Sequence, residues 1–339
     1  MKLCLLLLVA MNCFGAVNPK LTADEIRDGW VALYDGESLF GWRQNGSAGW
    51  ESTPTGRIRA RGSQAGRLEH GAAFGDFELK VAFHLESGAK AKLGLRCDGS
   101  GACGATVVLK SKPVDMSEIE IRAEGERIAA KIDGVSAEVV VGSGAKSGAV
   151  LLDVERDCEF QSVKLRPSGL GLVDQWTPKS GEKGGFVTVR RDGGVHLEGE
   201  GARANTVGNY FDFVMQVEAD LHFTRATQYG RGGILLRGDA YRVALDNRYK
   251  DRDPKKPVDV GTGGIAGKQD ARKIVSADRT VMILTIAVNG GHIATWVNGA
   301  QETDWTENPA AAGSGTIGLV AMDEATNLDF RRVRIGELR

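Results

Sequence analysis

The chain has 339 residues, with 43 lysines and arginines against 44 aspartates and glutamates. This balance argues against the broad basic surface with which proteins bind nucleic acid or anionic lipid. The 46 glycines show no collagen period and lie between short runs of valine, isoleucine and leucine, which indicates many tight turns between many strands. The length suits two ordinary domains or one large all-β domain.

The first residues, MKLCLLLLVAMNCFGA, combine one lysine, an apolar run and small residues at the end. They predict a secretory signal peptide over 1–16, with an apolar run too short for a membrane anchor after cleavage. We therefore expect export to the periplasm or the extracellular space. Cys97 and Cys103 flank a flexible loop and are expected to form a disulfide there, with free thiols or a metal pair as the alternatives.

In chain order, the first predicted element after that is a short helix in LTADEIRDGW. Thr22 and Glu25 form a capping box, and Gly29 ends the helix. Residues 77–85, FELKVAFHL, then alternate apolar and polar side chains, which predicts a strand with one buried face. Several more runs of this kind follow, and helical patterns are almost absent.

Segments of the first half recur in the second half in the same order. Residues 129–134 and 294–299 both read as a strand that enters a hairpin turn. The matched pairs are 73–86 with 209–222, 92–96 with 233–237, 129–134 with 294–299, and 160–167 with 330–337. This repetition predicts two homologous domains, over 17–168 and 172–339, and the many short strands predict all-β, jelly-roll β-sandwiches in tandem.

The second copy is longer than the first between its matched segments. The extra residues fall within 241–273, and binding or catalytic residues often occupy such insertions on a rigid sheet. In GGILLRGDAYRVALDNRY, two strands are predicted around a Gly-Asp turn, the second over Tyr241–Asn247. Alternation places Arg242 and Asp246 on one face of that strand and Asn247 on the other.

The stretch GWVALYDGESLFGW, residues 29–42, resembles the opening of the 3-keto-disaccharide hydrolase domain family. GGILLRG, WVNG and the closing FRRVRI of the second copy are similar to later parts of that family. The resemblance implies concanavalin A-like domains that act on 3-keto-glycosides as hydrolase, lyase or hydratase, with carbohydrate as the ligand. Arg242 and Ala244 stand where the family typically has Glu and Gln.

Elimination from a 3-keto-sugar needs a base for the C2 proton and a cation or hydrogen-bond donor at the enolate oxygen. We assign Asp246 as the base or as a metal-binding carboxylate, and Arg237 and Lys268 as the enolate stabilisers. Substrate contacts are expected from Arg242, Asn247 and Trp305, with Trp305 as a platform for a sugar ring.

Several alternatives remain open at this stage. A non-catalytic, lectin-like carbohydrate-binding or scaffold protein is the main one, and a metal-dependent glucanase is another. No cofactor is certain from the sequence, although the acidic residues of DRDPKKP are of the type that binds Ca²⁺. No histidine pair has zinc-site spacing, and His292 is expected to be exposed in a hairpin turn.

Overall fold

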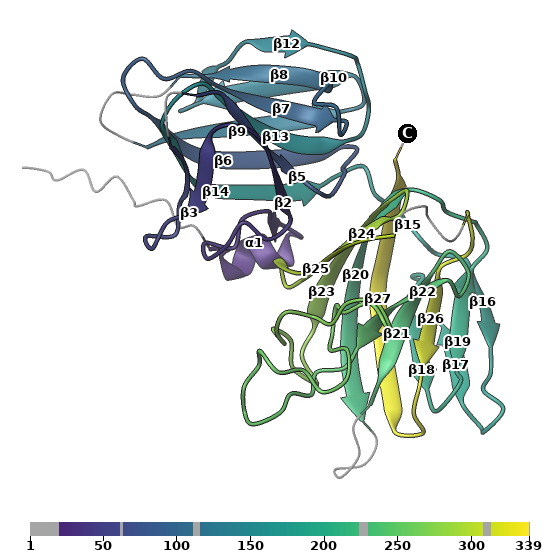
Figure 1. Cartoon of the computed structure of the whole chain (residues 1–339). Helices are drawn as coiled ribbons and strands as arrows, with labels where there is room; N and C mark the ends of the chain where they lie inside the picture. The colour runs from purple at the N-terminus through teal and green to yellow at the C-terminus, as the bar shows by residue number, and fades with distance from the viewer. Residues whose placement is uncertain (1–19, 62–63, 111–115, 224–229, 308–312, 339) are drawn as a thin grey trace, which may run out of the picture.

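The structure is a computed structural model that describes residues 20–61, 64–110, 116–223, 230–307 and 313–338. The predicted signal peptide over 1–16 lies outside these residues. Two jelly-roll β-sandwiches follow one another along the chain (Figure 1). All pairings between the named strands are antiparallel, so the prediction of an all-β fold is confirmed.

Helix α1 (Ala23–Arg27) begins at Thr22 as predicted. The Thr22 hydroxyl accepts a hydrogen bond from the Glu25 amide at 3.1 Å, and the Glu25 carboxylate accepts one from the Thr22 amide at 2.8 Å. This capping box satisfies two amides that the first turn of a helix leaves unpaired. Among the helices of the described residues, none is long and apolar enough to cross a membrane.

The first sandwich packs two sheets, which we name by their central strands β6 and β7. In spatial order the β6 sheet contains β11 (Val135–Ser136), β10 (Arg127–Ile132), β9 (Ser117–Glu124), β6 (Phe77–Leu85), β14 (Cys158–Pro167), β4 (Ile58–Arg61) and β3 (Gly49–Ser52), with β1 (Val31–Ala32) on β14. The β7 sheet contains β12 (Val139–Val141), β8 (Cys103–Leu109), β7 (Ala91–Cys97), β13 (Ala149–Val154), β5 (Gly66–His70) and β2 (Trp42–Gly46).

The second sandwich repeats this plan with sheets named after β20 and β21. The β20 sheet contains β17 (Phe186–Val189), β18 (Val195–Glu198), β27 (Thr326–Glu337), β20 (Phe213–Phe223), β23 (Met282–Asn289), β24 (His292–Val297) and β25 (Ala300–Thr306), with β15 (Gly171–Leu172) on β27. The β21 sheet contains β16 (Trp176–Lys179), β19 (Arg203–Thr206), β26 (Gly318–Ala321), β21 (Gly232–Leu236) and β22 (Tyr241–Leu245).

The strand order of the two copies agrees position by position. The run β10-β9-β6-β14 of the first sandwich corresponds to β24-β23-β20-β27 of the second, and β8-β7-β13-β5 corresponds to β22-β21-β26-β19. The two matched hairpin turns also agree: Asp133 and Gly134 have φ of 50° and 81°, and Asn298 and Gly299 have φ of 48° and 78°. Two successive left-handed residues suit the right-handed twist of the flanking strands.

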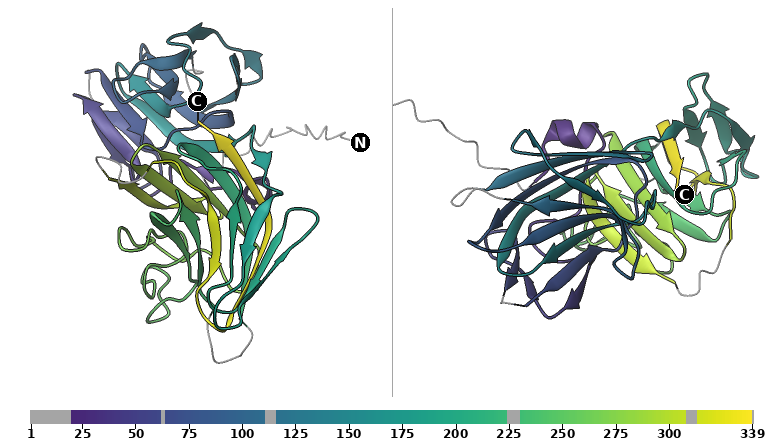
Figure 2. Two further views of the ribbon diagram at one scale, coloured as in Figure 1. Left: turned by 90° about the vertical axis from the view of Figure 1, so that its right-hand side faces the viewer. Right: turned by 90° about the horizontal axis from the view of Figure 1, so that it is seen from above.

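The first sandwich contacts the outer face of the β20 sheet through residues 29–42, which we call the opening segment. Gln216 Nε2 donates to the Gly29 carbonyl at 2.7 Å, and Trp296 Nε1 donates to the Ala32 carbonyl at 3.1 Å. The Ala32 amide donates to the Gly299 carbonyl at 2.9 Å. Figure 2 shows the contact between the two sandwiches from two further directions.

Apolar packing continues across this contact. Val214, Ala287, Ala294 and Trp296 belong to strands of the second sandwich, yet they pack into the core of the first, and Trp296 is fully buried. His70 of β5 stacks on Trp296, with ring centroids 5.9 Å apart. The two sandwiches therefore share part of one hydrophobic core and are not joined by the linker alone.

Candidate functional site

The opening segment limits where a ligand can bind to the second sandwich. It covers the outer face of the β20 sheet around Gln216 and Trp296, which are 3% and 0% exposed. A jelly roll offers its sheet faces and its strand ends to ligands. The end of β25 and the outer face of the β21 sheet are therefore the candidate ligand-binding surfaces of the second sandwich.

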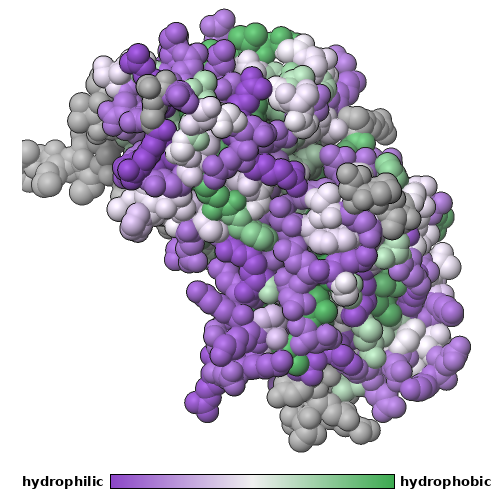
Figure 3. All heavy atoms as spheres, in the orientation of Figure 1, coloured by the Kyte–Doolittle hydropathy of each residue, from purple (hydrophilic) through white to green (hydrophobic). Residues whose placement is uncertain are grey.

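Residues 246–281, which we call the cap, close the edge of the second sandwich. The Ala266 amide donates to the Arg242 carbonyl at 2.9 Å, and the Ala244 amide donates to the Gly264 carbonyl at 2.8 Å, as in an added edge strand. On the other sheet, the Thr295 hydroxyl donates to the Gly263 carbonyl at 2.6 Å. The cap thus bridges β22 and β24. Figure 3 shows that the surface in the region of the cap is strongly hydrophilic.

Four side chains meet where the cap reaches the end of β25, and we call Tyr241, Lys268, Trp305 and Glu307 the rim cluster. The Glu307 carboxylate accepts hydrogen bonds from the Tyr241 hydroxyl at 2.7 Å and from the Lys268 ammonium at 2.8 Å. The Lys268 nitrogen lies 5.0 Å from the Trp305 ring centroid, and Tyr241 meets Trp305 edge-on with centroids 5.7 Å apart.

The local structure explains this meeting. Tyr241 begins β22 directly after the hairpin turn, and Lys268 lies in a turn of the cap in which the Lys268 amide donates to the Ile265 carbonyl at 3.0 Å. Trp305 and Glu307 are two residues apart at the end of β25, so they point to the same side. The side chains of Lys268 and Glu307 are 35% and 24% exposed, which leaves both charges within reach of a ligand.

The rim cluster holds a carboxylate, a hydroxyl donor, a cation and an indole ring within contact distance of one another. A carboxylate takes up protons, while an ammonium and a phenol stabilise negative charge that develops on an oxygen. Indole rings pack against the C–H faces of sugars. This combination matches the requirements of sugar binding and of proton abstraction beside a carbonyl group.

The structure brings together two of the six residues that the sequence singles out, Lys268 and Trp305. Sequence reasoning missed their partners Tyr241 and Glu307. The available signal for Glu307 was its spacing of two residues from Trp305, which puts the two side chains on one side of an extended chain. The ring of Tyr241 lies in the core, 4% exposed, while its hydroxyl reaches Glu307.

Asp246 lies in the cap rather than on a strand. The prediction of a strand to Asn247 was wrong in its end point, because β22 stops at Leu245. The Asp246 carboxylate accepts from Arg248 Nε at 2.8 Å and from Nη2 at 2.6 Å. Asp246 is 3% exposed, so this bidentate pair is largely withdrawn from solvent.

Asn247 lies inside the cap, and Arg242 lies on the β21 sheet, so neither joins the rim cluster. Asn247 is 9% exposed, donates to Asp278 at 2.9 Å, and accepts from the hydroxyls of Thr262 and Ser276, so it fixes the cap internally. Arg242 lies on the β21 sheet, with Nη1 2.8 Å from the Met322 sulfur. Among the described residues, Arg242 forms no ion pair with a carboxylate, which distinguishes it from Arg248.

Arg237 is buried at the end of β21, with its side chain 0% exposed. Nε donates to the Phe211 carbonyl at 2.8 Å, and Nη2 donates to Asp212 at 3.0 Å. Burial lowers the pKa of this guanidinium, and the neighbouring Asp212 opposes the shift. Arg237 thus pairs with Asp212, Lys268 with Glu307, and Asp246 with Arg248, so the expected catalytic set is not gathered around one point.

Two further acidic groups lie on β25, Glu302, which is buried, and Asp304, which is partly buried. Glu302 is 0% exposed, and its Oε2 accepts from the Lys273 amide of the cap at 2.8 Å. Burial raises the pKa of this carboxyl to about 7. Asp304 accepts from His292 Nε2 at 2.6 Å, and His292 is 7% exposed, so the expectation of an exposed His292 was wrong.

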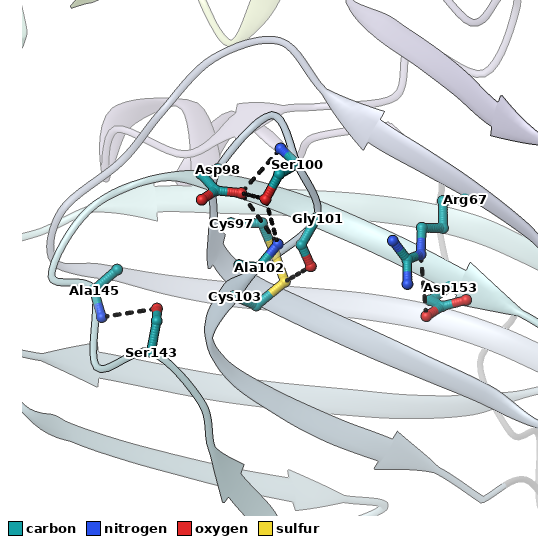
Figure 4. Close-up of a disulfide and its surroundings, with 10 residues drawn as sticks. All are labelled: Arg67, Cys97, Asp98, Ser100, Gly101, Ala102, Cys103, Ser143, Ala145 and Asp153. Atoms are coloured by element: carbon teal, nitrogen blue, oxygen red, sulfur yellow. Dashed lines mark hydrogen bonds and ion pairs between the residues drawn. A yellow bond between two sulfur atoms is a disulfide. The ribbon is translucent and has the colours of Figure 1, made fainter.

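Cys97 and Cys103 are joined by a disulfide that closes the loop between β7 and β8 (Figure 4). Within this loop the Asp98 carboxylate accepts hydrogen bonds from the Ser100 amide at 2.9 Å and from the Ser100 hydroxyl at 2.6 Å. These bonds lower the pKa of Asp98. In the part of the chain that the structure describes, no group of three or more metal-ligating side chains is set to hold a metal ion.

Comparison with known proteins gives one family match. The sequence matches the family model described as 3-keto-alpha-glucoside-1,2-lyase-like domain over residues 29–112 and 169–336. A comparison with curated proteins finds no match.

Solved structures give distant similarities. A glycosyl hydrolase candidate from Parabacteroides distasonis has 15% identity and a TM-score of 0.37 over 48% of this chain and 88% of its own. The carbohydrate-binding module CBM66 from Bacillus subtilis has 13% identity and a TM-score of 0.32 over 49% of this chain and 96% of its own. The exoplasmic/lumenal domain of VIP36, bound to Ca²⁺ and Man3GlcNAc, has 12% identity and a TM-score of 0.36 over 48% and 85%.

The family match extends from Gly29 in the opening segment to Gly336 in the last strand and includes parts of both sandwiches. From this match, the chain belongs to the 3-keto-alpha-glucoside-1,2-lyase-like domain family.

Proposed function

We propose that this protein is an exported enzyme that cleaves 3-keto-glycosides by elimination, with the rim cluster as its site. The observation that carries the proposal is the Glu307 carboxylate held between the Tyr241 hydroxyl and the Lys268 ammonium, beside Trp305. Membership of the family supports the substrate class. In this proposal residues 1–16 are removed on export, 17–168 and 172–339 form the two domains, and the Cys97–Cys103 disulfide suits an oxidising compartment.

The reaction assigns one role to each group. A ketone at C3 acidifies the C2 proton, which Glu307 takes up as the C2–H electron pair forms the enolate. Lys268 faces the enolate oxygen and stabilises its charge. The enolate then reforms the ketone, C1 and C2 become doubly bonded, and the C1–O bond breaks. The leaving alkoxide receives a proton from the Tyr241 hydroxyl, and water adds to the enone in a separate hydration step.

The test is the release of nitrophenolate from p-nitrophenyl 3-keto-glucoside by the full chain. We expect Glu307→Gln to lower kcat by about a hundredfold or more, because a general base contributes about 10² to 10⁴ in rate. Lys268→Met is expected to lower kcat by about tenfold to a hundredfold through the lost charge at the enolate. Asp246→Asn is expected to keep most of the activity.

Matched controls come from the same domain. Lys183 and Glu200 form an ion pair at 2.9 Å that resembles the Lys268–Glu307 pair but lies outside the rim cluster. Lys183→Met and Glu200→Gln should leave kcat unchanged. Loss of activity in Asp246→Asn together with full activity in Glu307→Gln would reject the rim cluster and return the base to Asp246.

A lectin-like protein that binds carbohydrate without turnover is the second candidate. The observation in its favour is that Arg237 and Asp246 are each held by a structural ion pair. Arg242 and Ala244 also replace the carboxylic acid and amide that family members carry on this strand. Saturable binding of the 3-keto-glucoside without nitrophenolate release, weakened in Trp305→Ala, would establish this function instead.

A further inference from the structure

A cavity of about 780 Å³ lies between the two sandwiches at the linker that follows β14. Its walls come from three parts of the chain: the turns at Gly75 and Gly125 of the first sandwich, the linker at 167–175, and the second sandwich around Tyr210 and Glu337. Small-molecule sites in proteins have volumes of about 300–1,000 Å³ and often lie at domain interfaces. The cavity shares no residue with the rim cluster.

The charged groups of this cavity are mainly acidic. Asp76, Asp174 and Glu337 contribute to the lining, while the basic contribution comes from Lys146, which pairs with Glu126 at 3.2 Å. The Asp76 Oδ1 atom accepts from Arg96 and from the Gly125 amide, which leaves Oδ2 on the side of Gly169. This charge disfavours phosphate, carboxylate and sulfate ligands and suits a ligand that donates hydrogen bonds.

Apolar and aromatic groups alternate with the carboxylates. The ring of Tyr210 is half-buried and packs edge-on against Phe213, with centroids 6.0 Å apart. Leu172 and Val207 are 52% and 64% exposed at the cavity. Burial and the nearby Glu337 carboxylate raise the pKa of Tyr210, which keeps its hydroxyl a donor. Such a surface offers flat apolar contacts beside hydrogen-bond acceptors, as the two sides of a sugar ring require.

Backbone hydrogen bonds hold the linker wall of the cavity on both sides. The Ser168 amide donates to the Asp76 carbonyl of the first sandwich at 2.9 Å, and the Val173 amide donates to the Val333 carbonyl of the second at 2.9 Å. This wall is therefore already ordered before a ligand binds, which lowers the entropic cost of binding.

We infer that this cavity is a second carbohydrate site, built jointly by the two copies and the linker, and that it binds a neutral glucose oligosaccharide. The inference goes beyond the proposed elimination and does not depend on it, because the cavity holds no residue of the rim cluster. It gives the first copy a function: half of a binding site that a single copy does not form.

The test uses the full chain, labelled with ¹⁵N, and maltotriose and cellotriose as probes. We expect at least one of the two to shift the amide signals of Gly169, Gly171 and Gly208 with one saturating curve, and to give the same affinity by calorimetry. Inorganic phosphate, glucuronate and putrescine serve as anionic and cationic probes and should leave these signals in place.

Two variants fix the location. Leu172→Arg places a long side chain at the cavity and should weaken sugar binding by at least about tenfold. Its matched control is Val141→Arg, at a residue 76% exposed on β12, which should bind as the unmodified protein does. Tyr210→Phe removes the hydroxyl donor at the cavity and should weaken binding by up to about tenfold.

Three results would overturn the inference. The first is no shift at these glycines with either sugar at millimolar concentration. The second is unchanged affinity in both Leu172→Arg and Tyr210→Phe, which would place the sugar elsewhere. The third is tighter binding of phosphate or putrescine than of either sugar at the same amides. None of these results depends on cleavage of a 3-keto-glucoside, so failure here and failure of the proposed elimination are separate outcomes.

Discussion

A buried arginine at a strand end occurs at the same place in both copies. Arg96 and Arg237 have φ of 54° and 51°, and their side chains are 2% and 0% exposed. Each donates Nη2 to an aspartate at 3.0 Å, Asp76 in the first copy and Asp212 in the second. Since the first copy lacks the cap and the rim cluster, this shared arrangement indicates that Arg237 holds its turn in place.

Asp212→Ala and Asp76→Ala each leave a buried guanidinium without its carboxylate, and each should lower the free energy of unfolding by about 3–5 kcal/mol. Urea unfolding of the two variants measures the loss. If Asp212→Ala keeps its stability but loses turnover of the 3-keto-glucoside, Arg237 belongs to the catalytic machinery after all.

The sequence predicted some side chains of the candidate site but not others. Lys268 was found because it lies in the long insertion, and Trp305 was found because an indole in a polar stretch is a candidate platform for a sugar ring. Asp246 was misplaced because alternation was carried past Leu245, where the cap takes over the backbone hydrogen bonds of the strand. Alternation places Asp246 and Arg248 on the same side, but it does not show that the two side chains pair with each other instead of facing a ligand.

The cap is the element that distinguishes the two copies. It replaces the short 110–116 connection of the first sandwich and fills the edge position beside β22 that β12 fills beside β8. It also reaches the first sandwich: Arg272 Nη1 donates to Asp35 at 2.9 Å, and the guanidinium lies 4.4 Å from the Phe40 ring centroid. One loop thus holds the rim cluster and contacts the opening segment.

We predict that Arg272→Met loosens the cap without unfolding the protein. The Arg272–Asp35 pair is partly exposed, so its loss should cost less than about 1 kcal/mol in global stability. Hydrogen–deuterium exchange should rise in peptides covering 262–275 and 33–41, because they lose their mutual contact.

Arg203→Met is the control for that variant. It breaks the pair with Asp239 at 2.6 Å, which lies within the second sandwich. Equal increases of exchange over 262–275 in the two variants would show that the Arg272 contact is not what holds the cap.

The element order was predictable to a large extent. Four matched segments in one order led to two copies of one topology, since matched strands occupy matched positions in the sheets. The capping box at Thr22 and the hairpin turn before Gly299 were also predictable, because each depends on a few neighbouring residues. The path of the cap was not, since its bonds to β22 and β24 join residues far apart in the chain.

The whole molecule is held together by a core that runs from one sandwich into the other. His70 lies in this core, fully buried, between Trp42 and Trp296. Its Nδ1 atom accepts from the Ala72 amide at 3.1 Å. Burial lowers the pKa of His70 to about 4, so the ring is neutral in the folded protein at neutral pH. No pattern in the sequence predicted this contact, because it joins residues of two different copies.

The pH dependence of stability follows from that pKa. The unfolded chain protonates His70 near pH 6.5, whereas the folded protein does so only near pH 4. The contribution of neutral His70 to the free energy of unfolding is therefore fully present above pH 6.5. It is lost as the pH falls to about 4, by up to roughly 3 kcal/mol.

Urea unfolding of the unmodified protein and of His70→Gln between pH 6.5 and pH 4 measures how steeply the free energy of unfolding of each protein falls with pH. The variant should lose less stability on acidification. Parallel curves for the two proteins would show that His70 is not kept neutral at the contact between the sandwiches.

The opening segment is part of the first copy, but its partners lie in the second, and this matters during synthesis. The ribosome completes residues 1–168 before the strands that cover this segment exist. Until β20 and β24 have formed, the carbonyls of Gly29 and Ala32 lack the hydrogen-bond donors Gln216 and Trp296 that they have in the finished protein. A chain truncated after residue 168 would therefore expose surface that the second copy normally covers, and we expect it to aggregate or to be bound by chaperones and degraded by proteases.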